Sequence, residues 1–211
     1  APSIKVDGEI HAIGKESLTD EQARSLVLET MNPTQQTEFL RDQESNYAIH
    51  SEAYGRFRAS AFIQRGQFGL VLRRIKSEIP RIPDLGLPPI VADLAMAKRG
   101  LVIFVGGTGT GKSTSLAAMV GHRNRHSRGH ILSIEDPIEF IHDHAGCLVT
   151  QREVGLDTES FEVGLKNALR QAPDVILIGE VRSAETMAHA LTFAETGHLC
   201  LCTLHANNAN Q

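Results

Sequence analysis

The residues with the clearest chemical meaning lie at positions 106–114, directly after the apolar run 101–105. Their spacing, G-x-x-x-x-G-K-S, places glycines where backbone N–H groups must turn towards phosphate oxygens. In such a loop Lys112 reaches the β- and γ-phosphates, and the Ser113 hydroxyl ligates Mg²⁺. Because a strand precedes the loop and a helical pattern follows it, the sequence predicts a nucleoside triphosphate site rather than an ordinary glycine-rich turn. The predicted nucleotide-binding residues of the loop are Gly106, Gly107, Thr108, Gly109, Thr110, Gly111, Lys112, Ser113 and Thr114.

Acidic residues follow two further apolar runs. Glu135, Asp136 and Glu139 come after the run 131–134, at the strand end where α/β sheets bind ligands, and one of them could polarise an attacking water. From the residues alone, a solvated acidic turn stays an open alternative. Glu180 follows the run 175–178 in the manner of a Walker B element. It is preceded by Gly179, where many phosphate-loop enzymes have Asp, so Glu180 is expected to serve the metal through a water.

Two histidines and two cysteines accompany the last apolar run, 199–203. His198 and His205 flank this run, and both are expected near the ligand edge, where they could sense the γ-phosphate. A structural role for either histidine is the alternative. Cys200 and Cys202 alternate, so they share one side of the strand. Small core residues are favoured there over a metal pair.

The elements that must position these groups repeat as strand and helix. We expect strands at 101–105, 131–134, 175–178 and 199–203, and helices at 112–124, 158–171 and 183–196. Asp157 or Thr158 and Ser183 are the expected N-caps, and Gly197 is the expected stop. Near-continuous apolar strands alternating with helices predict an α/β fold with a parallel sheet covered on both faces.

The first part of the chain has a different pattern. Residues 1–75 are expected to form a small α+β domain, with an Asp-Gly hairpin at 4–10, helices at 19–31 and 34–41, and strands at 47–49, 55–64 and 69–75. Residues 76–90 contain four prolines and are interpreted as a semi-rigid linker. The remaining residues, 91–211, form the predicted nucleotide-binding core.

Composition narrows the class of protein. A hydrophobic share of 41% suits one or two globular domains, and a net charge of −4 argues against a nucleic-acid partner. No apolar run approaches the roughly 20 residues of a membrane span. The three cysteines form no disulfide framework and, with a nucleotide site, indicate a reducing cytosol.

Four stretches of the chain resemble the four motifs of the secretion ATPases, in the same order. They are GGTGTGKST for Walker A, IEDPIEF for the Asp box, RQAPDVILIGEVR for Walker B and TGHLCLCTLHA for the His box. Within that class the chain resembles the type IV pilus retraction ATPases, the PilT/PilU family. The stretches GTGKSTSLAAM, QREVGLDTESFE and FAETGHLCLCTLHANNANQ look more like the PilU branch. The resemblance covers essentially the whole chain. It implies a RecA-like phosphate-loop core preceded by a PAS-like domain.

The resemblance also implies roles for single residues. Lys112, Ser113 and the loop glycines would bind ATP and Mg²⁺. Glu139 matches the catalytic glutamate that activates water, and Glu180 matches the Walker B acid that serves the metal. The remaining matches are to nucleotide-binding residues, namely the His-box residues His198 and His205 and the N-terminal arginines Arg58 and Arg73. From charge alone, solvent-facing arginines are the alternative for the last two.

For the whole molecule, the resemblance implies a cytoplasmic homohexamer in which residues 76–90 act as a hinge. Its expected partners are a PilT-like ATPase and the platform protein of the pilus machine at the inner membrane. Gly107 departs from the proline common in the family's loop, and this glycine is expected to loosen the loop without abolishing it. The chain starts inside the family's first N-terminal segment and lacks its C-terminal helices, so we expect a fragment of a longer protein.

Three functions compete at this point. The leading one is a Mg-ATP-hydrolysing motor subunit for pilus retraction and twitching motility. The second is a nucleotide-binding accessory module that docks on a partner motor and has little turnover of its own. The third is a DNA-translocating motor, which the acidic charge balance and the lack of a basic stripe disfavour.

Overall fold

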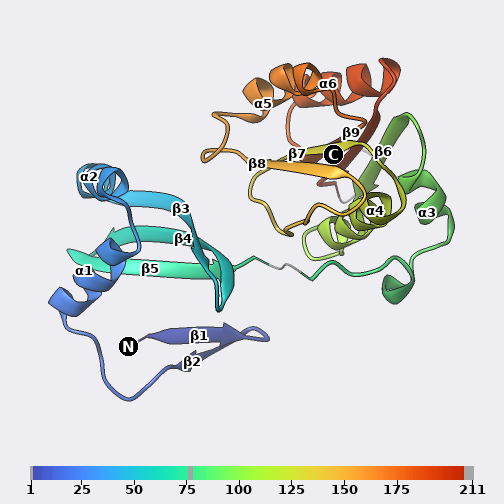
Figure 1. The fold of residues 1–211 in the computed structure, drawn as a ribbon. Helices are drawn as coiled ribbons and strands as arrows, with labels where there is room; N and C mark the ends of the chain where they lie inside the picture. Colours follow the sequence, from blue (N-terminus) through green and yellow to red (C-terminus); the bar gives the residue numbers. More distant parts are fainter. Residues whose placement is uncertain (1, 76–77, 207–211) are drawn as a thin grey trace. The chain divides into compact units, whose positions relative to one another are not determined.

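Figure 1 shows a computed structural model of the chain, which describes residues 2–75 and 78–206. The chain forms two compact units, Ala1–Ile75 and Lys76–Gln211. Within the described residues, no helix is both long enough and apolar enough to cross a membrane.

The first unit begins with a hairpin of β1 (Ser3–Val6) and β2 (Glu9–Ala12), joined by the turn at Asp7 and Gly8. Both turn residues have positive φ angles, 49° and 91°, which is why Asp-Gly suits this position. The hairpin predicted at 4–10 is confirmed, and the side chains of both strands are exposed.

The rest of the first unit packs two helices, α1 (Asp20–Glu29) and α2 (Pro33–Asp42), with a three-stranded antiparallel sheet. Each helix starts with a capping box, Thr19 with Gln22 and Asn32 with Gln35. The sheet order is β3 (Glu44–Ser51), β4 (Gly55–Gln64), β5 (Gln67–Arg74). The core of this unit comprises Val27, Met31, Phe39, Tyr47, Ala59 and Ala61.

The segment predicted as a linker, 76–90, differs from a free connection over its described part. Residues 76 and 77 lie outside the described residues. Ile82 is buried in the core of the second unit, and Leu85 and Leu87 pack against the same core. The segment also contains the short 3₁₀ turn Pro83–Leu85 and leads into α3 (Ile90–Ala95), which the sequence pattern did not predict. Apolar residues between the prolines explain why it packs rather than hangs free.

The second unit is built on a five-stranded sheet in which all four strand pairs are parallel. Its order is β6 (Gly100–Val105), β10 (Leu199–Leu204), β9 (Val175–Val181), β7 (His130–Glu135), β8 (Leu148–Glu153). The predicted α/β class with a parallel RecA-like sheet is confirmed. The strand β10 lies between β6 and β9. Its carboxyl end therefore lies between the end of β6, which leads into the glycine-rich loop, and the end of β9, which carries Glu180.

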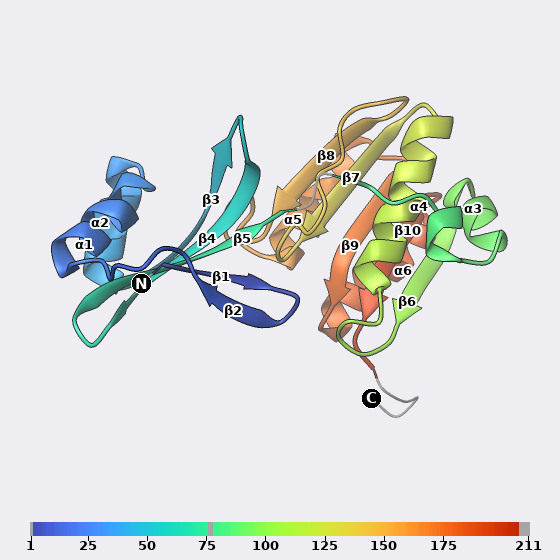
Figure 2. The same cartoon turned by 90° about the horizontal axis from the view of Figure 1, so that it is seen from below.

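Helices cover both faces of this sheet (Figure 1), and Figure 2 shows α4 in front of its strands. The helices α3 and α4 (Lys112–His126) pack on one face, and α5 (Phe161–Ala168) and α6 (Ala184–Glu195) pack on the other. Alternate strand residues enter the two layers, as the apolar strands predict: Leu177 joins the α4 layer, whereas Ile176 and Ile178 join the α5–α6 layer. Cys200 and Cys202 are buried in this second layer, which confirms them as core residues.

Besides α3, the elements β8 and α5 also differ from the prediction. The edge strand β8 was missed, because Thr-Gln-Arg-Glu gives it a polar sequence. The helix α5 starts at Phe161 with Ser160 as its N-cap, rather than at Asp157 or Thr158. Thr158 is buried and bonded through its backbone to Gly155 and Glu153, so it belongs to the preceding turn. Ser183 is the N-cap of α6 as predicted, and Gly197 follows its C-cap with a φ of 100°.

Candidate nucleotide site

The loop between β6 and α4 has the backbone that an anion site requires. Gly109 and Gly111 have φ angles of 80° and 90°, a region that residues with a Cβ rarely adopt. Gly111 is the N-cap of α4, and no side chain caps this helix start. The first N–H groups of α4 therefore point into the loop without a side-chain acceptor, where an anion would be favoured.

Lys112 is buried, and its ammonium lies against the loop. Lys112 Nζ donates to the carbonyl oxygens of Gly106 at 2.8 Å and Gly107 at 2.7 Å. It also lies 3.5 Å from Nδ1 of His205. Thr110 Oγ1 closes the loop by donating to the Gly107 carbonyl at 2.9 Å. These contacts hold the Lys112 ammonium close to the N-terminus of α4.

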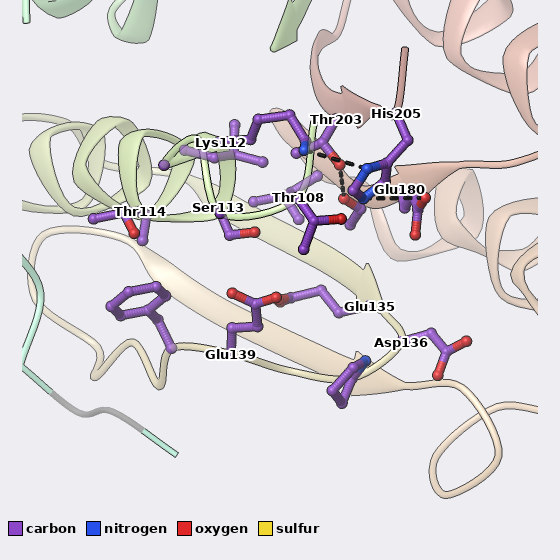
Figure 3. A pocket seen from close by; sticks show the side chains of 18 of the residues that line it. Thr108, Lys112, Ser113, Thr114, Glu135, Asp136, Glu139, Glu180, Thr203 and His205 are labelled. Atoms are coloured by element: carbon purple, nitrogen blue, oxygen red, sulfur yellow. Dashed lines mark hydrogen bonds and ion pairs between the residues drawn. The ribbon is translucent and has the colours of Figure 1, made fainter. Parts of the chain in front are cut away.

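A pocket of about 270 Å³ joins this loop to the carboxyl ends of three neighbouring strands (Figure 3). Because the strands are parallel, the residues that follow them meet at one edge of the sheet. The loop side of the pocket comprises Thr108, Gly109, Gly111, Lys112, Ser113 and Thr114. The opposite side includes Glu135, Asp136, Glu139, His142, Gly179, Glu180, Thr203 and His205.

Glu180 belongs to a charged network that ties the strand ends together. Arg182 donates from Nε to Glu180 Oε2 at 2.8 Å and from Nη1 to Asp136 Oδ2 at 3.0 Å. These hydrogen bonds, the one to Glu180 first, raise the pKa of Arg182. The other oxygen of Glu180 lies 3.4 Å from His205 Nε2. Because β10 lies between β6 and β9, His205 reaches both Lys112 and Glu180.

The packing around Gly179 explains why a glycine precedes Glu180 in this chain. A Cβ at this position would lie 3.0 Å from Cα of Glu135 and 3.3 Å from its Cβ, which is tighter than ordinary van der Waals contact. An aspartate here would therefore push against the end of β7. The close packing of β7 and β9 leaves Glu180 as the acidic residue that β9 directs into the pocket.

Glu135 is a half-buried carboxyl group with an unusual environment. Burial raises its pKa to about 7, although hydrogen bonds from Ser133, Gln151 and the backbone of Glu139 act in the opposite direction. Ser133 Oγ donates to Glu135 Oε1 at 2.6 Å, and Gln151 Nε2 donates to the same oxygen at 3.2 Å. The charge of Glu139 also raises this pKa, which indicates that the two carboxyl groups lie close together.

Glu139 lies in the loop after β7 and points into the pocket (Figure 3). Its side chain is exposed, whereas its neighbours Ile138 and Phe140 are buried, with exposed fractions of 3% and 7%. The buried neighbours turn Glu139 outward, facing Ser113 across the pocket. The loop also contains a cis peptide bond between Asp136 and Pro137.

The structure separates the two predicted histidines. His205 lines the pocket, but His198 precedes β10 at the opposite end of the strand, and its carbonyl accepts from the N–H of Gly100 at 3.0 Å. Its ring contacts Thr196 and the carbonyl of Phe193. The expectation that both histidines lie at the ligand edge is wrong, because a parallel strand presents only its carboxyl end there.

Arg58 and Arg73 belong to the first unit, where they lie directly opposite each other on β4 and β5. The pocket is lined by residues of the second unit. The part of these two arginines in nucleotide binding stays a prediction.

The pocket residues fit a nucleotide with Mg²⁺. Mg²⁺ usually keeps waters and is held by one or two side-chain oxygens together with the phosphates. The Ser113 hydroxyl and the Glu180 carboxylate both line the pocket and are oxygen ligands of this kind. Across residues 2–75 and 78–206, no group of three or more His, Cys, Asp or Glu side chains is placed to hold a metal.

Some residues of the site carried no recognised signal in the sequence. His142 lines the pocket, and burial lowers its pKa to about 4, so its ring is neutral near pH 7. Thr203 donates to the carbonyl of Gly179 and ties β10 to β9. Gln151 contacts Glu135 from β8, a strand that the hydrophobic pattern did not predict. Recognition of QREV as an edge strand paired with β7 could have found Gln151.

Residues 70–211 match the family described as Type II/IV secretion system protein. The type IV pilus ATPase PilU of Pseudomonas aeruginosa is 65% identical over 210 residues, which cover 100% of this chain and 55% of that protein. The type IV pilus retraction ATPase PilT of the same organism is 43% identical over 208 residues, which cover 99% of this chain and 60% of that protein.

A crystal structure of the pilus retraction motor PilT with bound ADP matches with a TM-score of 0.92 at 40% identity, over 98% of this chain and 61% of that chain. The chain thus spans little more than half the length of these relatives. The predicted resemblance is confirmed: the chain belongs to the Type II/IV secretion system protein family, and within it to the PilT/PilU group of type IV pilus ATPases.

Proposed function

We propose that this chain is the ATP-hydrolysing part of a type IV pilus motor that drives pilus retraction and twitching motility. The observation that carries the proposal is the single pocket in which Lys112 and Ser113 face Glu139 and Glu180. The similarity to PilU and PilT of Pseudomonas aeruginosa supports the assignment to pilus retraction. A twitching motility protein of Neisseria gonorrhoeae, 40% identical over 208 residues, supports it as well.

In the proposed mechanism, the loop glycines and the start of α4 bind the phosphates through backbone N–H groups. Lys112 turns from the carbonyls of Gly106 and Gly107 to the β- and γ-phosphates. Ser113 and Glu180 would hold Mg²⁺, which supplies positive charge to the phosphates when it is bound. Arg182 keeps the Glu180 carboxylate at the strand end through its hydrogen bond.

Glu139 is the proposed general base. Its exposed carboxylate points into the pocket from the side opposite Ser113, where it can accept a proton from the attacking water. His205, within reach of both Lys112 and Glu180, is placed to respond to a phosphate between them. His198 has no role in this mechanism, because it lies at the far end of β10.

At the level of the assembly, we propose a cytoplasmic homohexamer that acts on the inner-membrane platform of the pilus machine beside a PilT-like partner. Arg58 and Arg73 would close on the phosphates, and the segment 76–90 would act as the hinge. Similarity to the family supports these proposed roles, and the pocket itself does not bear on them.

The test is steady-state Mg-ATP hydrolysis together with ATP binding for the parent chain, Glu139→Gln, Lys112→Ala and the control Glu159→Gln. Glu159 is an exposed acid outside the pocket. We expect Glu139→Gln to bind ATP but lose turnover by about 100-fold or more, since a general base contributes roughly that factor. Lys112→Ala should weaken binding itself by about tenfold or more, because a hydrogen bond to a charged group contributes roughly 1.5–3 kcal/mol.

Normal hydrolysis by Glu139→Gln would refute the assigned roles. If the parent and Glu139→Gln both bind ATP and neither hydrolyses it, the accessory module that docks on a partner motor would replace the proposed function.

A further inference from the structure

Two side chains of the edge strand β8 have no part in the mechanism above. Gln151 and Glu153 alternate with Arg152, so both lie on the same face of the strand. Glu153 is only 2% exposed, although a buried carboxylate is costly unless it is hydrogen-bonded. Both residues belong to the stretch QREV, whose chemistry the sequence pattern left unexplained.

Glu153 binds the backbone on one side of Glu139. Its Oε2 atom accepts a hydrogen bond from the N–H of Ile138 at 3.1 Å. Ile138 is itself buried, with an exposed fraction of 3%. The residue immediately before the proposed general base is therefore fixed by both its side chain and its N–H group.

Gln151 binds the backbone on the other side. Its Nε2 atom donates to the carbonyl of Phe140 at 2.9 Å, and its Oε1 atom accepts from the N–H of His142 at 2.8 Å. A single side-chain amide thus holds two peptide groups of the loop, one on each of its polar atoms. Donor and acceptor are both needed, so neither a carboxylate nor an apolar side chain can replace the amide fully.

The same amide also connects the loop to Glu135. Gln151 Nε2 donates to Glu135 Oε1 at 3.2 Å. The backbone of Glu139 makes a further hydrogen bond to the Glu135 carboxyl group. Side chains of β7 and β8 therefore hold the backbone at residues 138, 139, 140 and 142, and Glu139 is at the centre of this set.

We propose that Gln151 and Glu153 are positioning residues that hold the loop after β7 so that Glu139 keeps a fixed place in the pocket. The inference rests on the proposed function, in which Glu139 accepts the proton of the attacking water. Proton transfer depends steeply on geometry, and a displacement of about 1 Å can lower a rate by about 100-fold. Neither residue lines the pocket, so each acts through the loop and not on the nucleotide.

The experiment uses variants that remove the hydrogen bonds with little change in shape. Gln151→Met and Glu153→Met lose them, whereas Glu153→Gln keeps an oxygen that can accept from Ile138. Thr150→Val is the matched control, because it removes a 2.9 Å contact with His130 Nε2 from the opposite face of the same strand. Turnover, nucleotide affinity and the amide exchange rates of Ile138 and His142 are measured for each variant, alongside Glu139→Gln.

We expect both methionine variants to lose about 10- to 100-fold in turnover while nucleotide affinity stays within about threefold of the parent. Amide exchange should accelerate at Ile138 in Glu153→Met and at His142 in Gln151→Met. Glu153→Gln should recover most of the turnover, and Thr150→Val should behave as the parent. This recovery separates positioning from a general loss of stability, which would lower affinity and turnover together.

The inference is overturned if both methionine variants hydrolyse ATP as the parent does, or if affinity falls as far as turnover. Unchanged exchange at both amides overturns it whatever the turnover. If Glu139→Gln itself hydrolyses normally, it is the proposed function that fails. The exchange rates then still decide whether β8 holds the loop.

Discussion

At the scale of single residues, burial and hydrogen bonding have opposite effects on the pKa of Glu135. Burial raises the pKa of its carboxyl group from 4.5 to about 7 despite three hydrogen bonds that favour the charged form. The native chain therefore keeps a proton on Glu135 over a range in which the unfolded chain has released it. Because the native state binds more protons there, the free energy of unfolding contributed by this group falls as the pH rises from about 4.5 to about 7.

Replacement of Glu135 by Gln should remove this dependence, since the amide resembles the protonated acid and does not titrate. At pH 8 we expect Glu135→Gln to have a free energy of unfolding about 1–3 kcal/mol above that of the parent, and at acidic pH the two should converge. Urea unfolding at four pH values across this range measures the difference. Glu159→Gln, at an exposed position, should follow the parent throughout, and a constant gap between Glu135→Gln and the parent would contradict the explanation.

Single residues also show where sequence reasoning succeeds. The loop from Gly106 to Ser113 could be predicted because its phosphate-binding residues are consecutive in the sequence and are of few types, mainly Gly, Lys and Ser. His198 was placed at the ligand edge although it precedes its strand, and the predicted parallel sheet already implies that only residues following a strand reach that edge. Gln151 and Glu153 escaped notice because their partners are backbone groups 9 to 15 residues away, to which no residue pattern corresponds.

At the scale of elements, the start of α5 shows how a cap competes with a turn. Asp157 and Thr158 are capping residues by type, but the chain uses them in the turn after β8, where Asp157 Oδ2 accepts from the N–H of Glu153 at 2.9 Å. Ser160 then caps the helix by accepting from the N–H of Val163 at 3.2 Å. Local preference alone could not choose among Asp157, Thr158 and Ser160, three capping residues within four positions.

We therefore expect Ser160→Ala to lower the free energy of unfolding by about 1 kcal/mol, the usual value for a lost N-cap. Ser160→Asp should restore most of it, because an aspartate can accept the same hydrogen bond. Glu159→Ala, one residue earlier, is the control and should have little effect. Chemical denaturation of the four chains provides the comparison, and equal losses from Ser160→Ala and Glu159→Ala would place the cap elsewhere.

Elements with a continuous apolar pattern were predictable, and those without one were not. The strands β6, β7, β9 and β10 have cores of Val, Ile and Leu that reveal them. The edge strand β8 carries the polar run Thr-Gln-Arg-Glu, in which Gln151 and Glu153 bond to the loop after β7, so its pattern resembles a loop. Helix α3 has only six residues, which is too short for a helical period to be recognised.

On the scale of the whole molecule, the two units have separate hydrophobic cores. The boundary after residue 75 coincides with the change from antiparallel to parallel strands. The segment that follows looks like a linker in sequence because of its prolines, yet Ile82 anchors it in the second core. Proline content predicts an extended backbone, but it does not tell whether the intervening apolar residues are buried.

Separate cores predict two unfolding transitions in calorimetry. Saturating Mg-ATP should act chiefly on the second unit, whose free energy of unfolding should rise by about 2.7 kcal/mol at 100 times the dissociation constant. Phe39→Ala, in the core of the first unit, should lower the other transition, since loss of a buried phenylalanine costs about 3–5 kcal/mol. A single transition that both changes shift together would show that the units unfold as one.

The glycine at 179 limits how the site can be altered. Because a Cβ there would meet the Glu135 backbone at 3.0 Å, an aspartate at this position fits only if the end of the neighbouring strand yields by a few tenths of an ångström. We therefore expect positions 179 and 135 to be coupled, so that the effect of Gly179→Asp depends on how far the backbone at Glu135 can shift. The proposed metal ligand of β9 is thus Glu180, whose place beside β7 depends on a glycine that lets the two strands approach closely.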